Sequence, residues 1–356
     1  MTFDLKKLFR DVFAPQPGEV VAVIVDFPHD EFTDNPEWQD RRAMAERWHR
    51  TIGELAVEAK IEVRPLIRYP ATGSHNSDLP STMVCDDKEI ATDTLMSEAT
   101  IIVCMSEFSA SAPLALYARN NERLRAASMP RVAPAMEKTG LAADYALVAD
   151  TCARLAPHFE RAVGVEVEFS TGHRCYFDLS NHNQVLQDNG VLHLGVDDRI
   201  ANLPSGEVCV CPNELEASQT AGEIPAHIGG ETIVFNVKAN KIVDVVGSGS
   251  EAARLRDDFK SEKAMRNIAE VAIGCNPSAA VTGNVLEDEK AGFHWAYGRS
   301  DHLRGMVGVS DFSSPDKVCH EDIVYAKESP IVCRSFDFVF EDGTRKNAIK
   351  EGELLI

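Results

Sequence analysis

Residues 20–26 read VVAVIVD. A continuous run of apolar and β-branched residues of this length is typical of a strand that is covered on both faces. Strands of that kind belong to parallel sheets with helices packed on either side. The run therefore predicts that the N-terminal half of the chain is built around a helix-covered sheet.

The segments that follow alternate between helical and strand-like patterns. Asn35 and Pro36 precede a helical pattern over residues 37–60. Further strands are expected over residues 61–67, 99–105 and 132–136, and further helices over residues 113–124 and 139–161. This alternation predicts a largely parallel sheet. A dinucleotide site has little support, because no GxGxxG motif follows the first strand.

The pattern changes at about residue 164, where runs of alternating apolar and polar residues begin. Strands are expected over residues 165–170, 174–179, 190–195, 207–211, 231–237, 241–246 and 332–340, with one helix over residues 250–269. At 356 residues the chain is long enough for two domains. We predict an α/β N-terminal domain (residues 1–162) with a largely parallel sheet and a strand-rich α+β C-terminal metal-binding domain (residues 163–356).

The composition excludes several classes of partner. The 56 acidic and 36 basic residues give a net charge of −20, which argues against binding to nucleic acids or anionic membranes. No apolar run is long enough to span a membrane, and the N-terminal MTFDLKKLFRDVF lacks the apolar core of a signal peptide. The nine cysteines are scattered and form no CxxC pair. We therefore expect a cytoplasmic protein with reduced thiols.

The residues suited to chemistry gather late in the chain. Carboxylates and imidazoles are the ligands that divalent transition metals prefer. Within residues 270–322 they are Glu270, Glu289, His294, His320 and Asp322. Glu207 precedes them at the junction of a Pro-Ser-Gly turn and a strand. On a strand, His320 and Asp322 would point to the same face.

Each of these residues also has an ordinary structural interpretation. Glu207 could be a solvated turn residue, and His294, among aromatic residues, could be a core histidine. Glu270 lies in an apolar run, where it is either turned to the surface or buried with a compensating cation. Taken together, however, these residues favour a metal centre, because the acids and histidines follow one another along the chain beside turns and strand edges.

Four segments carry a resemblance: NLPSGEV, AEVAIGCNP, DEKAGFHWAYG and HED, in this order. Together they resemble the thermophilic metallo-aminopeptidase family typified by aminopeptidase T. The resemblance implies a homodimer that cleaves a peptide or small-molecule substrate with a cocatalytic pair of divalent metals (zinc, cobalt or manganese). The matching metal ligands are Glu207, Glu270, Glu289, His294, His320 and Asp322. Glu270 matches the carboxylate that contacts both metals or activates water.

Two positions depart from the family pattern. Asp301 stands where the family usually has a tyrosine that is thought to stabilise the tetrahedral intermediate, and Phe293 stands where it tends to have threonine. An ionised acid cannot donate a hydrogen bond to an oxyanion. His302, Tyr297 or Tyr325 could replace the tyrosine, and we assigned catalytic roles to Glu270, His302 and Tyr297. The substrate could then be an unusual amide rather than a peptide.

A second resemblance suggests different chemistry. Cys319 to Asp322 is similar to the C-H-x-D segment of 2,5-dihydroxypyridine 5,6-dioxygenases, which hold one Fe(II) with two histidines and one carboxylate. Those enzymes carry a histidine at the position of Glu270. Because this chain has Glu270 and keeps Glu207 and Glu289, the two-metal hydrolase is favoured. A third alternative is a non-catalytic binding protein with a relic site.

Overall fold

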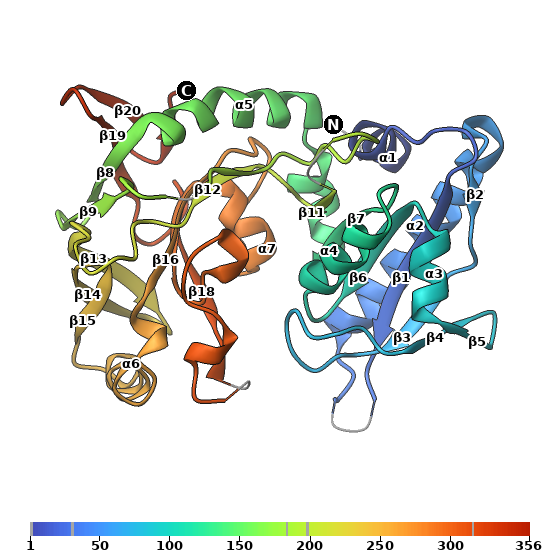
Figure 1. The fold of residues 1–356 in the computed structure, drawn as a ribbon, viewed down its shortest axis with the longest axis horizontal. Helices are drawn as coiled ribbons and strands as arrows, with labels where there is room; N and C mark the ends of the chain where they lie inside the picture. Colours follow the sequence, from blue (N-terminus) through green and yellow to red (C-terminus); the bar gives the residue numbers. More distant parts are fainter. Residues whose placement is uncertain (1–2, 30–31, 183, 197–198, 315–316) are drawn as a thin grey trace. The chain divides into compact units, whose positions relative to one another are not determined.

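The computed structural model describes residues 3–29, 32–182, 184–196, 199–314 and 317–356. The chain divides into two compact units (Figure 1). Unit 1 consists of Met1–Ala149, Asp188–Ser205 and Asn276–Ala280. Unit 2 consists of Asp150–Gln187, Gly206–Cys275 and Val281–Ile356. Unit 1 therefore takes two short later segments in addition to the N-terminal residues.

Unit 1 contains a mixed, mostly parallel sheet, as predicted. Its strand order is β11-β7-β6-β1-β3-β4-β5, with β2 beside β1. The parallel strands are β1 (Val20–Phe27), β2 (Glu62–Val63), β3 (Ile67–Pro70), β6 (Ile101–Ser106), β7 (Arg125–Pro130) and β11 (Ile200–Asn202). An antiparallel hairpin of β4 (Thr82–Cys85) and β5 (Lys88–Ala91) extends one edge.

Helices cover this sheet because its strands are apolar on both faces. Ala22 and Ile24 of β1 share a buried cluster with Leu95 of α3 (Thr92–Glu98) and Leu114 of α4 (Ser111–Asn120). The longest helix, α2 (Pro36–Ala59), also packs on β1. Asn35 caps its N-terminus by accepting a hydrogen bond from the backbone N–H of Trp38 at 2.8 Å. The first helix, α1 (Leu5–Phe13), packs against α2.

Two expectations for this part of the chain were wrong. The strand expected over residues 132–136 lies earlier, as β7, and the expected range holds the start of the 3₁₀ helix η1 (Pro134–Lys138). Residues 125–130 read RAASMP and carry no β-branched side chain, so pairing with β6 and β11 rather than local preference makes them a strand. The helix expected from residue 139 begins at residue 145, as α5 (Tyr145–Arg161), after the 3₁₀ helix η2 (Gly140–Ala142).

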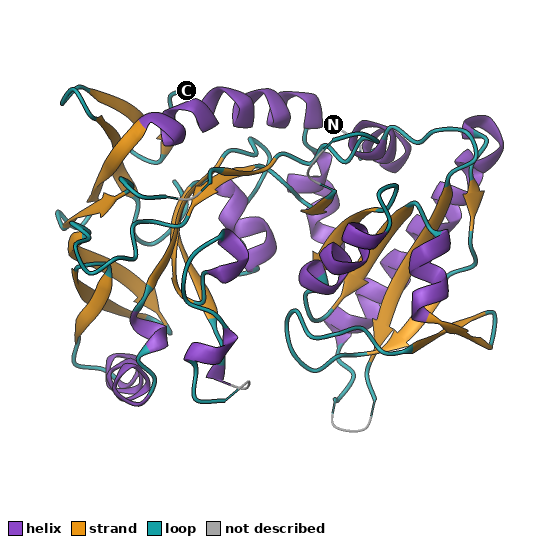
Figure 2. Ribbon diagram, in the orientation of Figure 1, coloured by secondary structure: helices purple, strands orange, loops and turns teal. Residues whose placement is uncertain are grey.

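Unit 2 is rich in antiparallel strands (Figure 2). An eight-stranded sheet has the order β15-β14-β13-β9-β8-β19-β20-β21. Its strands are β8 (Ala162–Phe169), β9 (Arg174–Asp178), β13 (Ala221–Ile228), β14 (Glu231–Lys238), β15 (Lys241–Val246), β19 (Cys333–Phe340), β20 (Arg345–Lys350) and β21 (Glu353–Leu354). A five-stranded sheet has the order β10-β12-β16-β17-β18. Its strands are β10 (Leu186–Asp188), β12 (Glu207–Val210), β16 (Ile268–Gly274), β17 (Phe293–Gly298) and β18 (His320–Tyr325).

Two further expectations were wrong in this region. No strand forms over residues 190–195; the nearest one, β10, ends at residue 188. The helix expected over residues 250–269 ends at residue 261, as α6 (Ser250–Ser261), and its last expected residues belong to β16. The apolar run from Ile268 joins β16 because β12 and β17 pair with it on either side.

The aromatic core of unit 2 lies against one face of the five-stranded sheet. Trp295 and Tyr297 of β17 pack on Phe235 of β14, with ring centroids 5.6 and 6.1 Å apart. Tyr325 of β18 packs on Phe169 of β8 at 4.8 Å. These residues occupy odd-numbered positions, so the even-numbered positions of β17 and β18 point to the opposite face. That opposite face carries the candidate site.

Candidate metal centre

Strand register brings the predicted ligands to one face of the five-stranded sheet. Residues paired across neighbouring antiparallel strands point to the same side. The pairs that fix the register are Glu207 with Gly274, Glu270 with Ala296, Ala272 with His294, Ala296 with Asp322, and Gly298 with His320. The positions between the ligands are therefore alanine or glycine. Such small residues leave room above the sheet for the longer acidic and imidazole side chains to converge.

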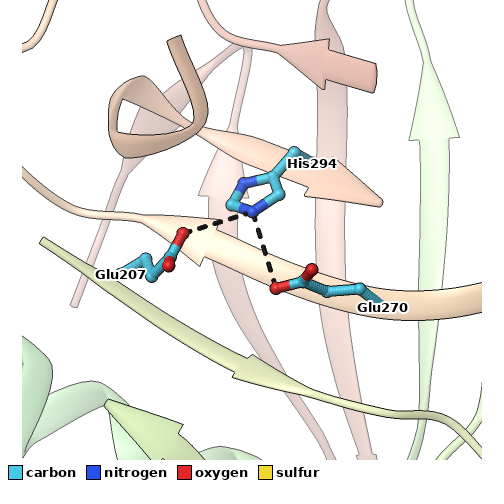
Figure 3. A group of neighbouring side chains, drawn as sticks. All are labelled: Glu207, Glu270 and His294. Carbon is cyan, nitrogen blue, oxygen red and sulfur yellow. Dashed lines mark ion pairs between the residues drawn. The ribbon is translucent and has the colours of Figure 1, made fainter. Parts of the chain in front are cut away.

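The first group of ligands consists of Glu207, Glu270 and His294 (Figure 3). Nε2 of His294 lies 3.4 Å from Oε2 of Glu207 and 3.9 Å from Oε1 of Glu270. One ligand atom from each of the three residues lies within 4.8 Å of the others. Nδ1 of His294 lies 3.3 Å from the carbonyl oxygen of Gly292, which leaves Nε2 directed toward the carboxylates.

The second group consists of Glu270, His320 and Asp322, so Glu270 belongs to both groups. Nε2 of His320 lies 2.9 Å from Oε2 of Glu270 and 3.6 Å from Oδ1 of Asp322. Nδ1 of His320 lies 2.7 Å from the carbonyl oxygen of Arg299. A backbone carbonyl at this position holds the proton on Nδ1, the arrangement that metal-binding histidines usually have.

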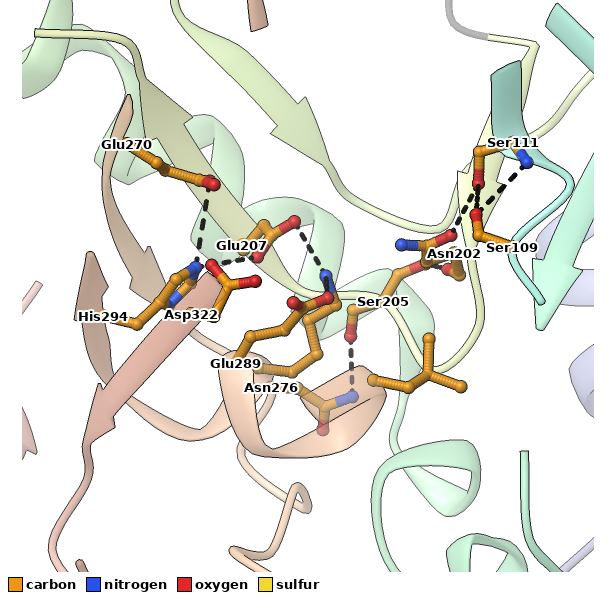
Figure 4. Close-up of polar contacts among 12 residues, drawn as sticks. Ser109, Ser111, Asn202, Ser205, Glu207, Glu270, Asn276, Glu289, His294 and Asp322 are labelled. Carbon is orange, nitrogen blue, oxygen red and sulfur yellow. Dashed lines mark hydrogen bonds and ion pairs between the residues drawn. The ribbon is translucent and has the colours of Figure 1, made fainter. Parts of the chain in front are cut away.

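Glu289 is beside these groups but in neither of them (Figure 4). It begins the 3₁₀ helix η4 (Glu289–Ala291), and its Oε1 pairs with Nζ of Lys290 at 2.7 Å. Nζ of Lys290 also lies 2.7 Å from Oε1 of Glu207, and the lysine side chain is fully buried. Lys290 thus holds one oxygen of Glu207 and leaves the other facing His294. Lys290 was not among the predicted site residues; its position directly after the predicted ligand Glu289 is the sequence signal that could have indicated its role.

The close approach of η4 to β16 depends on Gly274. A Cβ atom at this position would lie 2.2 Å from the carbonyl oxygen of Glu289 and 2.4 Å from the carbonyl carbon of Lys290. Real Cβ contacts of that length do not occur without a backbone shift. Because Gly274 also pairs with Glu207, this glycine lets the Glu289–Lys290 segment reach Glu207.

The site is electrostatically polarised. Burial alone would raise the pKa of Glu207, but Lys290 and His294 outweigh burial and lower this pKa to about 2. The pKa of Asp322 likewise falls to about 2, because His320 outweighs burial. Burial would lower the pKa of His294, but Glu207 and Glu270 raise it to about 9. Burial, followed by Glu207 and Asp322, raises the pKa of Glu289 to about 8 against the opposing effect of Lys290.

The residues fit a divalent metal ion. Oε2 of Glu207 and Oδ1 of Asp322 are buried and have no hydrogen-bond partner among the residues that the structure describes. Buried carboxylate oxygens without partners are costly in a folded protein. Burial would lower the pKa of His294 and of His320, but the acids beside them raise both, so the two imidazoles carry protons in a site without metal. A cation coordinated by these oxygens and by the two imidazoles would satisfy the oxygens and take the place of those protons.

Of the three residues that could replace the family tyrosine, only one lies beside the metal groups. Tyr297 lies on the aromatic face, with its ring 5.4 Å from that of Phe259, so it does not face the metal groups. Tyr325 is also on that face and donates a hydrogen bond to the carbonyl oxygen of Pro225 at 2.8 Å. His302 does reach the site, because its ring centroid is 4.7 Å from that of His320. Asp301 pairs with Arg299 at 2.5 Å.

A cavity of about 430 Å³ lies in unit 2, beyond the end of β12. Its polar walls include Ser180, Asn213 and Glu214. Cys211 also lines the cavity. Glu207, Cys209 and Cys211 are alternate residues of the chain, and alternate side chains along a strand point to the same face. Glu214 accepts a hydrogen bond from the hydroxyl of Ser300 at 2.7 Å. The cavity was not predicted, because it is formed by loops without a sequence signature.

Comparison with solved structures identifies the class of fold. The chain is similar to 2,5-dihydroxypyridine dioxygenase from Pseudomonas putida KT2440, with a TM-score of 0.64 and 16% identity over 100% of this chain and 98% of that one. It is also similar to wild-type AmpT (aminopeptidase T) from Thermus thermophilus, with a TM-score of 0.57 and 16% identity over 99% of both chains. No protein-family model matches the sequence. No curated protein matches it either.

The chain therefore has the fold common to these two proteins, both of which are enzymes. Because those two enzymes catalyse different reactions, the fold alone does not assign an activity to this chain. Among the helices that the structure describes, none is both long enough and apolar enough to cross a bilayer.

Proposed function

We propose that this protein is a metal-dependent hydrolase that cleaves a C–N bond with two divalent ions in the site. The observation that carries the proposal is the position of Glu270, which belongs to both ligand groups. A carboxylate shared between two groups, each with its own histidine and its own second acid, is the arrangement that a pair of metal ions requires. A mononuclear site would leave one histidine and one acid without a metal ion to coordinate.

The roles of the side chains follow from their contacts. When bound, the metal ions would activate water and polarise the scissile carbonyl group. Glu207 and His294 would hold one ion, and His320 and Asp322 the other. Glu270, 5% exposed, lies between the two histidines; it would contact both ions or take a proton from water and pass it to the leaving nitrogen. Lys290 would position Glu207, and the carbonyl of Arg299 would orient His320.

The surroundings of the site favour a small amide as the substrate. Asp301 is paired with Arg299. His302 and Arg299 hold its pKa below the ordinary value, so it stays ionised and cannot donate to an oxyanion. His302 is the donor-bearing group beside His320 that remains for this task. His302 would therefore replace the family tyrosine as the donor, from a different position in the chain. An aminoacyl amide or a related small amide suits such a site better than a long peptide.

The proposal is tested by metal content together with hydrolysis. Protein loaded with zinc, manganese or cobalt should contain two ions per chain and should release amine from small aminoacyl amides. Glu270→Gln should lower turnover by about 100-fold or more, as loss of a general base does. The matched control is Glu223→Gln, the same chemical change at an exposed position of β13, and it should keep full activity. Equal activity of wild type and Glu270→Gln would refute the proposed role of Glu270.

A second candidate is a mononuclear Fe(II) dioxygenase. It is supported by the group of Glu270, His320 and Asp322, which alone would present three ligands to one ion. A set of two histidines and one carboxylate would need a second imidazole. The candidates are His302, whose ring centroid lies 4.7 Å from that of His320, and His294, whose Nε2 lies 3.9 Å from Oε1 of Glu270. One iron per chain, with oxygen uptake on a dihydroxylated aromatic ring, would favour this reaction. Two bound ions without any turnover would favour a binding protein.

A further inference from the structure

Two buried cysteines lie next to each other beside the backbone of Glu207. Cys152 is in α5, and Cys275 directly follows β16. Their sulphur atoms are 3.3 Å apart, although 123 positions separate them in the sequence. Neither forms a disulfide bond, and their exposed fractions are 0% and 6%. The scattered positions of the nine cysteines along the chain give no sign of this pair.

Both cysteines contact the backbone that carries Glu207. The thiol of Cys152 lies 3.7 Å from the carbonyl oxygen of Glu207 and donates to it. The backbone N–H of Cys275 donates to the carbonyl oxygen of Gly206 at 2.7 Å. In addition, Gly274, the neighbour of Cys275, is the strand partner of Glu207. The two cysteines therefore contact the backbone segment that positions one proposed metal ligand.

We propose that Cys152 and Cys275 form a site of reversible oxidation that takes a small-molecule disulfide as its oxidant. The more exposed Cys275 attacks one sulphur of the oxidant as a thiolate, and the other half of the oxidant leaves as a thiol. Cys152 then displaces the remaining half, which leaves as a second thiol. The protein gains one S–S bond and loses two hydrogens, and the oxidant is reduced to two thiols.

Closing the bond requires a small movement with a defined consequence. A disulfide bond is about 2.05 Å long, so the two sulphurs must approach by roughly 1.3 Å from 3.3 Å. Oxidation also removes the thiol hydrogen that Cys152 donates to the carbonyl oxygen of Glu207. Both changes act on the backbone of Glu207. This second part rests on the proposed metal site: oxidation should weaken metal binding by 10- to 100-fold, the usual effect of disturbing a group that orients a ligand.

The modification is tested without any assay of activity. The full-length protein is equilibrated with glutathione disulfide, the remaining thiols are blocked, and a non-reducing digest is analysed by mass spectrometry. We expect a cross-linked peptide pair containing Cys152 and Cys275, with a mass two hydrogens below the sum of its peptides. Adding dithiothreitol should remove it. Failure to find this pair, while the partly exposed Cys85 and Cys319 acquire glutathione, would overturn the proposal.

Matched variants separate the modification from its effect on the metal site. Cys152→Ala and Cys275→Ala should each abolish the cross-link, whereas Cys85→Ala should keep it. The dissociation constant for zinc should rise on oxidation in wild type and stay constant in Cys275→Ala. A cross-link with unchanged zinc affinity would confirm the modification site and refute its coupling to Glu207. Absence of zinc binding by reduced wild type would instead count against the proposed function, with the cross-link unaffected.

Discussion

Unit 1 and unit 2 each bury charged groups, but in opposite ways. In unit 1, Glu19 and Arg125 are both fully buried, and both carboxylate oxygens of Glu19 accept from Nη2 of Arg125, at 2.6 and 2.7 Å. Nη1 of Arg125 donates to the carbonyl oxygens of Phe13 and Leu192. In unit 2, four carboxylates gather with one lysine and two histidines, and two of their buried oxygens have no hydrogen-bond partner among the described residues.

The difference separates a structural ion pair from a ligand site. One acid matched by one base is neutral as a pair, and the hydrogen bonds of Arg125 connect α1, β7 and the segment around Leu192. Acids gathered on one face of a sheet require cations among them, either protonated histidines or a metal ion, because like charges repel and buried charges lose solvation. The gathering of several acids with two histidines, rather than burial of charge as such, therefore distinguishes the candidate centre.

The largest expected effect is at the structural pair. Glu19→Ala leaves the guanidinium of Arg125 buried without its acid and should lower the free energy of unfolding by about 3–5 kcal/mol. Urea unfolding followed by circular dichroism measures this change. Metal content should be unaffected. As a control, Glu54→Ala, which removes the exposed partner of Lys6, should leave the urea midpoint nearly unchanged. A small loss in Glu19→Ala would contradict the contrast between the two regions.

Asp26, at the end of β1, is a buried acid of a third kind. It accepts hydrogen bonds from Nε1 of Trp38 and the backbone N–H of Glu107, both at 2.8 Å. Burial raises its pKa from 3.8 to about 6 in spite of these donors. The folded state therefore holds this proton more tightly than the unfolded chain, so stability should fall as the pH rises from about 4 to about 6, by about 3 kcal/mol in total.

The measurement is the difference in unfolding free energy between wild type and Asp26→Asn across pH 4 to 7. Wild type should lose stability relative to the variant as the pH rises, because only wild type has this carboxyl group. The absolute stability of the variant does not matter, since the readout is the slope of the difference. A difference independent of pH would mean that neutral donors suffice to hold Asp26 ionised at no cost.

Metal ions should stabilise unit 2 through the acidic group. At a free metal concentration of about 100 times the dissociation constant, binding adds about 2.7 kcal/mol to the free energy of unfolding. Thermal unfolding with zinc and with a chelator measures the shift. His320→Ala should lose most of it, whereas His227→Ala, an exposed histidine of β13, should keep it. An equal shift in both variants would place the metal elsewhere.

The smallest expected effect concerns the close packing at Gly274. Gly274→Ala would push a Cβ atom against the carbonyl oxygen of Glu289 and should cost about 1–3 kcal/mol. It should also weaken metal binding, because η4 carries Lys290 to Glu207. The control is Gly53→Ala in α2, where no atom lies within 4 Å of the added Cβ; this change should be neutral or stabilising. Normal metal binding by Gly274→Ala would refute the dependence on η4.

Sequence patterns predicted the elements with strong local signals. The apolar run at residues 20–26, the Asn-Pro start of α2 and the hairpin of β14 and β15 all have the predicted type and nearly the predicted bounds. Errors occurred where pairing rather than composition decides the structure. The RAASMP segment of β7 has weak strand propensity, and the apolar run of β16 was joined to the preceding helix. For such segments, the partner strand supplies the hydrogen bonds that local preference does not.

The types of residue at the candidate centre, and their order along the chain, were determined by the sequence alone. Carboxylates and imidazoles near turns and strand edges could be identified as candidate ligands by their chemistry. Their grouping was decided by strand register, which turns Glu207, Glu270, His294, His320 and Asp322 to one face and Tyr297 to the other. Register is a relation between distant segments, so it has no signature within any one of them. The contact of Lys290 with Glu207 and that of Cys152 with Cys275 arise for the same reason.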